Sequence, residues 1–462
     1  MSDTRKRIMF FRFDNFEKTE KKLEKLASKG LFLEECGSFL WTFRKGKPQK
    51  VKYTVTYFPE GSVFNPGITD KQQTYFDYAE AAGWNFVTGF NQMQIFTSKA
   101  DNPIPFETDE KEKLENIKQC MKKSFLPYMI VMILIFAFNL VVHFNSFKLN
   151  PIDFLSDTSR LLPVLMFSAI ILYNAYTLID YLLWCRRSEK SIAIRGTCAR
   201  RSFLVQKIVD TIFLCFIIAS TAYLLFHLAL KTSFLFLFLS IAQMPILIFV
   251  FWSSIRYLKK KKASRSKNRA ISYVVLIAAD FAYVALLMIF IMQFGLRPSD
   301  DSNYRTIDWQ LTKTESHKYR LYSDEIPLSS QDLYGPSDYD YYSYESELDT
   351  TIFLSRSSYR QDSPPAKDSP PEIEYEIIEP RFDFVYSLAR EDLLEIPDWR
   401  DNTSFVPISN KTFGTVEAYQ RHYGKKQTGE YALFFKDKII ALHMEEALTP
   451  KQIALVKDKL QI

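Results

Sequence analysis

One acidic side chain lies well inside an apolar run of the sequence. Asp280 is flanked by alanines in the stretch 271–294. Burying an ionisable group in a bilayer is costly, so such a residue is a candidate functional site. A proton or ion pathway would need a second acid or a basic partner at similar depth, and the sequence offers none. Two interpretations stay open: Asp280 acts in transport, or it is a neutral or hydrogen-bonded structural group with a partner such as Asn174.

The other reactive side chains form no complete catalytic set. His443 stands near Glu445 and Glu446 but has no nucleophile within sequence reach. Cys185 and Cys198 share one loop and lack the two further ligands that a zinc site needs. The 13 glycines are too scattered to form a phosphate loop, and neither Gly-x-Ser-x-Gly nor His-Glu-x-x-His occurs. The sequence therefore predicts no catalytic residue, no cofactor and no metal site.

Five apolar runs predict a block of membrane-spanning helices over residues 125–295. Each run is long enough to cross a bilayer, which needs roughly 20 residues at about 1.5 Å each. The runs cover residues 125–144, 161–184, 208–230, 234–252 and 271–294. We expect a multi-span α-helical membrane protein with two small α+β soluble domains, one before and one after this block.

Basic residues in two loops predict the orientation of the block. One loop follows the second run, and the other follows the fourth. Cationic loops stay cytoplasmic, so five crossings place the N-terminus in the cytoplasm and the C-terminus outside the plasma membrane. The tight turn at Lys231 leaves open that the third and fourth runs form a re-entrant hairpin. Candidate contacts with anionic lipid are Lys259, Lys260, Lys261, Lys262 and Arg265.

The net charge of +6 is distributed unevenly along the chain. The basic excess belongs to the loops of the membrane block, whereas residues 296–462 are acidic. This distribution argues against a nucleic-acid partner. All five cysteines precede the fourth apolar run, so the predicted outer domain cannot rest on disulfides. We expect no signal peptide at the polar N-terminus, and we expect the first run to act as the insertion signal.

Residues 1–106 read as a small cytoplasmic domain. Predicted strands cover 7–13, 31–44, 50–57 and 85–97. Two predicted helices end at Gly30 and Gly83, with Asn15 capping the first and Thr69 or Asp70 capping the second. The order β-α-β-β-α-β predicts a ferredoxin-like fold. A polar helix over 107–124, capped by Thr108, then connects this domain to the first span.

Three segments of this domain carry a resemblance to a known family. They are Tyr78-Ala79-Glu80-Ala81-Ala82-Gly83-Trp84, Gln94-Ile95-Phe96 and Pro103-Ile104-Pro105. About the first 110 residues resemble the bacterial "domain of unknown function 2812" family. The family often has an acidic residue where this chain has Thr56. The resemblance implies a membrane-attached protein of Gram-positive-type bacteria, often paired with PadR-type transcription regulators, and it implies no established activity.

Gly83, Trp84 and Trp41 are further candidate functional residues. In one interpretation Gly83 ends a helix with positive φ, and Trp84 fills the core. In the other, Trp84 and Trp41 line a groove for a small ligand or a partner, together with the phenylalanines of the first strand. Ferredoxin-like folds host many unrelated functions, so the fold alone does not decide between these interpretations.

Residues 296–462 predict an extracytoplasmic α+β domain. Strands are expected near 381–388, 412–421 and 430–444, with a proline-rich linker or loop over 362–371. A tyrosine-rich acidic segment follows Tyr334; it is either a solvated loop or a surface for an outer peptide or wall ligand. Thr449 caps a closing helix that begins at Pro450.

Three functions fit this layout. The first is a membrane-embedded sensor or regulatory protein that links an outer domain to a cytoplasmic domain and its protein partner. The second is a transporter or channel component that uses Asp280. The third, a membrane enzyme, is the least favoured because the five histidines and scattered acids form no visible constellation.

Overall fold

The structure is a computed structural model, and its chain divides into two compact units. The first unit comprises Met1–Ala137, Ala169–Ala219 and Thr232–Arg297, and the second comprises Phe138–Ser168, Ser220–Lys231 and Pro298–Ile462. Each unit is described separately below. The structure describes residues 4–9, 16–37, 40–105, 109–199, 203–231, 234–294, 304–310, 316–336, 340–364, 371–395 and 403–461.

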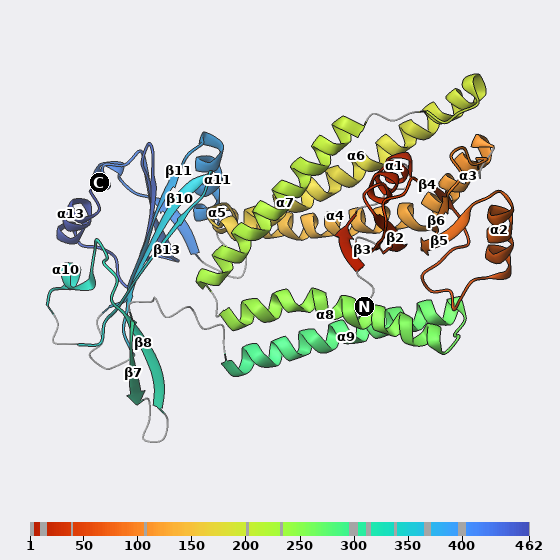
Figure 1. Cartoon of the computed structure of the whole chain (residues 1–462). Coiled ribbons are helices and arrows are strands. Elements are labelled where there is room, and N and C mark those ends of the chain that lie inside the picture. The colour runs from red at the N-terminus through yellow and green to blue at the C-terminus, as the bar shows by residue number, and fades with distance from the viewer. Residues whose placement is uncertain are drawn as a thin grey trace. The chain divides into compact units, whose positions relative to one another are not determined.

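Five helices are long and apolar enough to cross a membrane, as the sequence predicts (Figure 1). Long apolar side chains cover their outer surfaces, which is typical of helices that face lipid. The chain is therefore a membrane-embedded helical protein with additional sheet domains. The five helices are α4 (Leu126–Leu149), α6 (Thr158–Arg195), α7 (Phe203–Lys231), α8 (Phe234–Lys260) and α9 (Arg265–Phe294).

The N-terminal region folds as two consecutive β-α-β-β segments. In each segment the last strand lies between the other two, and all pairings are antiparallel. The first segment contains β1 (Thr4–Ile8), α1 (Phe16–Ala27), β2 (Leu31–Glu35) and β3 (Leu40–Lys45). The second contains β4 (Lys52–Tyr57), α2 (Asp70–Ala81), β5 (Asn85–Phe90) and β6 (Met93–Ser98).

The two three-stranded sheets differ from the four-stranded sheet of the ferredoxin-like prediction, which is not confirmed. The predicted strands 31–44 and 85–97 are each a hairpin of two strands. Asn91, with φ of 56°, makes the turn that pairs Phe90 with Met93. Asparagine tolerates this left-handed conformation, so a short turn fits inside an apparently continuous strand. The predicted cap Asn15 lies outside the described residues.

Helix ends follow the predicted local chemistry. Thr69 caps α2 by accepting the backbone N–H of Gln72 at 3.3 Å. Gly30 and Gly83 follow α1 and α2 with φ of 77° and 82°. The connecting helix α3 (Glu110–Cys120) is capped by Asp109, whose carboxylate accepts the backbone N–H groups of Lys111 and Glu112. The predicted cap Thr108 lies outside the described residues. A π-helical turn, η1 (Met121–Phe125), joins α3 to α4, so Glu110–Leu149 is one continuous helix.

Membrane helices complete the core of the N-terminal region. Its central side chains include Trp41, Phe43 and Val55, all fully buried. The same cluster takes in residues of α3 and of the end of α6, namely Leu114, Ile117, Cys120, Tyr181, Trp184 and Cys185. The N-terminal region is therefore built onto α3 and α6.

The second unit contains a seven-stranded antiparallel sheet in the order β12-β13-β14-β15-β11-β10-β9. Its strands are β9 (Ser343–Thr350), β10 (Leu354–Asp362), β11 (Ile373–Pro380), β12 (Thr403–Pro407), β13 (Glu417–Tyr423), β14 (Lys426–Phe434) and β15 (Ile439–Met444). A separate hairpin pairs β7 (Tyr304–Gln310) with β8 (Ser316–Tyr322). Part of the tyrosine-rich segment thus forms the edge strand β9, whereas the solvated-loop interpretation placed all of it outside the sheet.

Helices cover the sheet on both faces. Alternate residues of β15 enter different apolar clusters: Leu442 packs toward α13 (Pro450–Lys459), and Ile439 packs toward α11 (Asp383–Leu394). The short helices are α10 (Ser330–Tyr334) and α12 (Asn410–Phe413). Thr449 caps α13 with Pro450 in its first turn, as predicted. The predicted strand at 381–388 is wrong, because these residues mostly belong to α11.

The α11 cluster also includes a helix from the membrane block. Short helix α5 (Pro151–Ser156) lies in the chain between α4 and α6 and buries Ile152 and Leu155 against Leu354, Ile378 and Val385. The sheet domain is therefore built onto the connection between two membrane helices.

Candidate functional site

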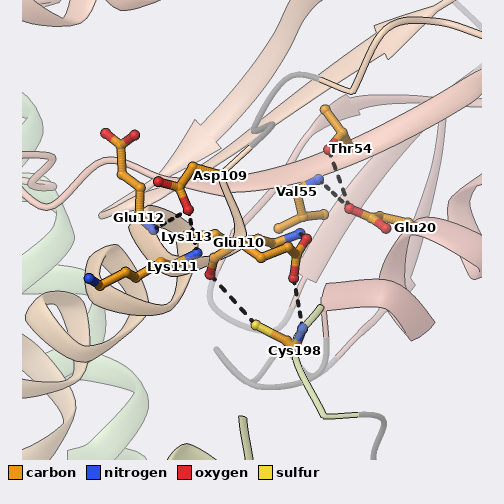
Figure 2. Close-up of polar contacts among 9 residues, drawn as sticks. All are labelled: Glu20, Thr54, Val55, Asp109, Glu110, Lys111, Glu112, Lys113 and Cys198. Atoms are coloured by element: carbon orange, nitrogen blue, oxygen red, sulfur yellow. Dashed lines mark hydrogen bonds and ion pairs between the residues drawn. The ribbon is translucent and has the colours of Figure 1, made fainter. Parts of the chain in front are cut away.

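A polar joint attaches the N-terminal region to the segment that follows α6. The backbone N–H of Cys198 donates to Glu110 Oε2 at 3.1 Å, and its thiol lies 3.8 Å from the Glu110 carbonyl oxygen (Figure 2). Lys113 Nζ is 3.9 Å from Glu110 Oε1 and lies 4.2 Å from the centre of the Phe16 ring. This joint, defined by Glu110, Lys113 and Cys198, ties the start of α3 to the end of α6.

An ion pair between α3 and α6 and two hydrogen bonds between α6 and the segment that follows it reinforce this joint. Lys118 Nζ on α3 lies 2.6 Å from Glu189 Oε1 on α6. The indole N–H of Trp184 donates to the Ala199 carbonyl at 3.1 Å, and the Ala199 N–H donates to Ser188 Oγ at 3.2 Å. The segment after α6 therefore folds back along its own helix and brings Cys198 to Glu110.

Glu20 fixes α1 to the sheet beside this joint. Its carboxylate accepts the backbone N–H of Val55 at 2.8 Å and the hydroxyl of Thr54 at 3.4 Å (Figure 2). Burial raises the pKa of Glu20, whereas the Val55 N–H and the charge of Lys113 act in the opposite direction. Glu20 therefore positions α1 on the sheet, and its hydrogen-bond donors come from the protein itself.

Cys198 at the joint and Cys36 in the N-terminal core are poor nucleophiles. Burial, followed by the neighbouring Glu110, raises the pKa of Cys198 to about 12. Burial likewise raises the pKa of Cys36 to about 12, although the Thr88 hydroxyl opposes the shift. Both groups stay protonated thiols at neutral pH, and the thiolate is the reactive form. The geometry favours a structural joint over a thiol reaction.

A second joint attaches the loop between β4 and α2 to α9. Asn268 is fully buried; its side-chain N–H donates to the Phe64 carbonyl at 3.0 Å, and its oxygen accepts the Ser272 hydroxyl at 3.2 Å. Arg265 donates to the Glu60 carbonyl at 3.1 Å. The Phe64 ring also lies 6.0 Å from that of Tyr273. The N-terminal region thus contacts α9 as well as α6.

A third joint, within the second unit, attaches α5 to the sheet. Arg356 on β10 binds Asp153 of α5 and Glu376 of β11. The Thr351 hydroxyl donates to the Leu155 carbonyl at 2.6 Å. The Asp392 carboxylate accepts the Ile152 N–H, and burial raises the pKa of Asp392 to about 6. Charge and hydrogen bonds therefore reinforce the apolar packing of α5.

Asp280 finds its partner on a different helix from the predicted one. Gln243 on α8 donates its side-chain N–H to Asp280 Oδ1 on α9 at 2.9 Å. Asn174, the example given for such a partner, instead donates to the Ile170 carbonyl at 2.8 Å within α6. The expected hydrogen bond to a neighbouring span is thus present, but with a different residue. Asp280 also borders a hollow of about 420 Å³ between α8 and α9, whose other lining residues are Met244, Leu247, Ile248, Phe251, Leu276 and Ile277.

The structure does not bring the two candidate tryptophans together. Trp41 is fully buried in the core shared with α3 and α6. Trp84 belongs to a smaller cluster with Phe76 and Phe96, and its indole N–H donates to the Ile104 carbonyl at 2.7 Å. The phenylalanines of the predicted groove lie outside the described residues. Both indoles therefore serve the core, and Gly83 supplies the positive φ between α2 and Trp84.

The candidate lipid-contact residues lie at the end of α8, in the turn that follows it and at the start of α9. Lys260, Lys261 and Lys262 are exposed, and Lys259 is partly buried. Arg265 is exposed but donates to the Glu60 carbonyl, which gives it a role in the second joint. Exposure of the lysines is compatible with a lipid contact and equally with a solvated turn.

A charged group on the sheet was not anticipated from the sequence. Arg421, only 9% exposed, donates to Glu430, and His443 Nδ1 lies 3.6 Å from Glu430 Oε2. The His443 hydrogen bond and the Arg421 charge lower the pKa of Glu430 to about 2. The only sequence signal is that alternation places Glu430 and His443 on the same face once their strands pair. Among the described residues, no three His, Cys, Asp or Glu side chains gather as metal ligands.

The comparison with known families bears on the region that holds the first two joints. Residues 15–129 match the family described as Protein of unknown function (DUF2812). This match confirms the resemblance of the N-terminal region and extends beyond it through α3 and η1 into α4. The part of the chain that matches the family thus includes the helix that completes the core. No curated protein and no solved structure matches the chain.

Proposed function

We propose that this protein is a membrane-embedded regulatory protein in which the sheet domain of the second unit controls the N-terminal region through α6. The observation that carries the proposal is the anchoring of α6 at both ends. Its start follows α5, which Arg356 and Thr351 hold against the sheet. Its end packs Tyr181 and Trp184 into the N-terminal core.

The proposal draws support from the chemistry of these anchors. A helix transmits a displacement only when both ends are fixed to the parts that move. Lys118, Glu189 and the Glu110–Cys198 contact fix the inner end, and Arg356 with Asp153 fixes the other. Both anchors consist of side chains that the protein itself pairs or packs. The arrangement therefore suits signalling better than catalysis.

We further propose that the N-terminal region faces the cytoplasm and the sheet domain faces the outside, as the basic loops predict. In that orientation a peptide or wall component would act on the sheet domain, and a cytoplasmic protein would bind the N-terminal region. The family resemblance makes a PadR-type regulator the first partner to test. Exposed Tyr78 and Phe86, on either side of Gly83 and Trp84, are suitable positions for a photo-crosslinking residue.

A topology map tests the orientation. Single cysteines would replace the exposed residues Lys47, Lys261 and Lys425, in a background with Cys198 and Cys215 changed to serine, and intact cells would be treated with an impermeant thiol reagent. We expect labelling at Lys425→Cys alone, and labelling of all three positions after lysis. Equal protection of Lys47→Cys and Lys425→Cys in intact cells would place both regions on one side and overturn the two-sided proposal.

A second experiment tests the coupling in the full chain in lipid nanodiscs. Arg356→Ala removes the outer anchor, and the alkylation rate of Cys198 reports on the inner joint in a Cys215→Ser background. We expect a several-fold change in that rate, while buried Cys36 stays unmodified and shows that the N-terminal fold persists. The control is Arg360→Ala on the same strand. Identical Cys198 rates in all three proteins would contradict regulation through α6.

A transport role for Asp280 is the alternative function. Its support is the pairing of Asp280 with Gln243 beside the apolar hollow between α8 and α9. Asp280→Asn keeps an acceptor for Gln243 but removes the titratable charge. A change in ion or proton flux across proteoliposomes, with the melting temperature unchanged, would favour transport. Equal flux in the variant and the unchanged protein would rule Asp280 out of a pathway.

A further inference from the structure

The second unit exposes an apolar patch at one end of its sheet. Three of its side chains are largely exposed: Ile352 at 69%, Phe382 at 49% and Phe384 at 54%. Phe353 joins them, because its ring centre lies 6.3 Å from that of Phe382 and 6.4 Å from that of Phe384. The Phe382 and Phe384 rings stack at 5.7 Å. We call these four residues the aromatic patch.

The aromatic patch lies beside the connection between two membrane helices. Thr351, next to Ile352 in the chain, donates its hydroxyl to Leu155 of α5. Phe353 packs against the cluster that contains Ile152 and Leu155, which Phe147 of α4 also contacts. Phe353 of the patch therefore packs against the same apolar cluster as Phe147 near the end of α4 and Leu161 near the start of α6, where a spanning helix leaves the apolar part of a bilayer.

The last turns of α4 also expose apolar side chains. Leu149, the last residue of α4, is 76% exposed, and Phe144 is 56% exposed. Water-exposed aromatic groups are costly, whereas phenyl rings and aliphatic chains are stabilised at the boundary between headgroups and acyl chains. Because the exposed surface of α4 belongs in lipid, the same bilayer is the nearest apolar environment for the patch.

We propose that the aromatic patch inserts into the membrane leaflet where α4 ends and α6 begins, and so anchors the sheet domain to the bilayer surface. The insertion fixes this end of the sheet at a second place, in addition to the third joint with α5. The sheet domain would then respond directly to the lateral packing of the lipids in that leaflet.

Charges beside the patch indicate which lipids it accepts. A polar hollow of about 350 Å³ borders Phe382 and is lined by Arg381, Asp383, Lys436 and Asp437, among others. Two cations and two acids balance, so the hollow has no preference for anionic headgroups. Insertion therefore depends on apolar burial, and we expect little dependence on salt or on lipid charge.

Spin-label accessibility in the full chain tests the insertion. Ile352→Cys and Phe384→Cys would each carry a nitroxide, in a background with Cys198 and Cys215 changed to serine, in phosphatidylcholine nanodiscs. The matched control is Tyr423→Cys, also an exposed side chain at 59%. Tyr423 and Glu417 lie at opposite ends of β13. Glu417 pairs with Phe434, which belongs to the apolar cluster that contains Ile152 and Leu155 of α5, so Tyr423 lies at the strand end away from that cluster.

Oxygen dissolves in lipid, whereas a nickel chelate stays in water, so the two relaxation agents separate the outcomes. We expect both patch labels to be several-fold more accessible to oxygen than to nickel, and the Tyr423 label to show the reverse, with the same result when a third of the lipid is phosphatidylglycerol. Nickel accessibility at the patch equal to that at Tyr423 would overturn the proposal. Protection of the patch labels from both agents would assign the patch to a protein contact and would overturn it as well.

Discussion

The guanidinium of Arg356 on β10 binds the carboxylate of Asp153 on α5, 203 residues earlier in the chain. Glu376 binds the same guanidinium from β11, so one cation on β10 holds one acid on a helix and one on the neighbouring strand. The Arg356 side chain is 20% exposed, and that of Asp153 is 43% exposed. Solvent therefore partly screens this ion pair, and its main effect is to fix the position of α5 on the sheet.

Replacing Arg356 by alanine should destabilise the sheet domain. Glu376 would lose its bidentate partner while only 17% exposed, which costs about 1–3 kcal/mol in the free energy of unfolding. Thermal unfolding in detergent measures the effect. Arg360→Ala is the matched control, because Arg360 is 50% exposed and pairs only with Asp362 among the described residues. Equal melting temperatures for the two variants would show that the α5 joint rests on apolar packing alone.

Asp392 predicts a pH dependence of stability. Burial, aided by Asp153, raises its pKa to about 6 in the folded chain, above the value of about 4 expected when unfolded. The free energy of unfolding therefore falls as pH rises from about 4 to 6, and the penalty is complete above pH 6. Asp392→Asn keeps an acceptor for the Ile152 N–H and removes this penalty.

We expect Asp392→Asn to melt higher than the unchanged protein at pH 8 and close to it at pH 4. The difference between the two melting curves at each pH removes the contribution of other titrating groups. A difference that does not change between pH 4 and pH 8 would mean that Asp392 is hydrated and titrates normally.

Glu430→Gln should destabilise the sheet at neutral pH. Arg421 would remain 9% exposed without its anionic partner, at a cost of about 2–3 kcal/mol, which is below that of a fully buried pair because Glu430 is 28% exposed. The pKa of Glu430 is lowered to about 2, so its contribution is present above about pH 4 and is lost as pH falls toward 2.

The deficit of Glu430→Gln should accordingly shrink between pH 5 and pH 2.5, as thermal unfolding would show. Glu374→Gln is the control, because Glu374 pairs with His443 across the strands but is exposed. A loss for Glu374→Gln as large as that for Glu430→Gln would mean that His443, rather than Arg421, determines the effect.

Asn268→Ala should loosen the loop between β4 and α2 from α9. The substitution leaves the buried Phe64 carbonyl without its donor, at about 1–3 kcal/mol for the docking of that loop. Limited proteolysis in nanodiscs should then cut within residues 58–69 several-fold faster. The control is Lys267→Ala, at the exposed neighbouring position, which the protease should cut at the same rate as the unchanged protein. If Asn268→Ala is cut no faster than the unchanged protein, the loop is held to α9 by Arg265 and the aromatic contacts instead of by Asn268.

Local features of the fold were predictable from the sequence. Long apolar runs gave the membrane helices, because a bilayer demands continuous apolar length. The helix ends at Gly30, Gly83 and Thr449 followed from chemistry confined to a few neighbouring residues. These predictions do not depend on which residues pack together in the fold.

Features that depend on tertiary packing were not predictable. The apolar residues of the segment 381–388 indicated a strand, yet the segment is mostly helical, with Val385 and Ala389, four residues apart, buried together. Glu110 with Cys198 and Arg356 with Asp153 carry no spacing signal, since each pair is brought together by the fold. Both joints proposed to couple α6 were therefore invisible in the sequence.

The core of the N-terminal region has a consequence for how the chain is made. Trp41 and Phe43 are synthesised early, but their neighbours Leu114, Ile117, Tyr181 and Trp184 follow much later and belong to helices continuous with the membrane block. The first hundred residues must therefore leave the ribosome with an unfinished core and wait until two helices are inserted. Without α6, the cluster around Trp41 would lack Tyr181, Trp184 and Cys185. The N-terminal core is therefore complete only after a membrane helix more than a hundred residues later has been made.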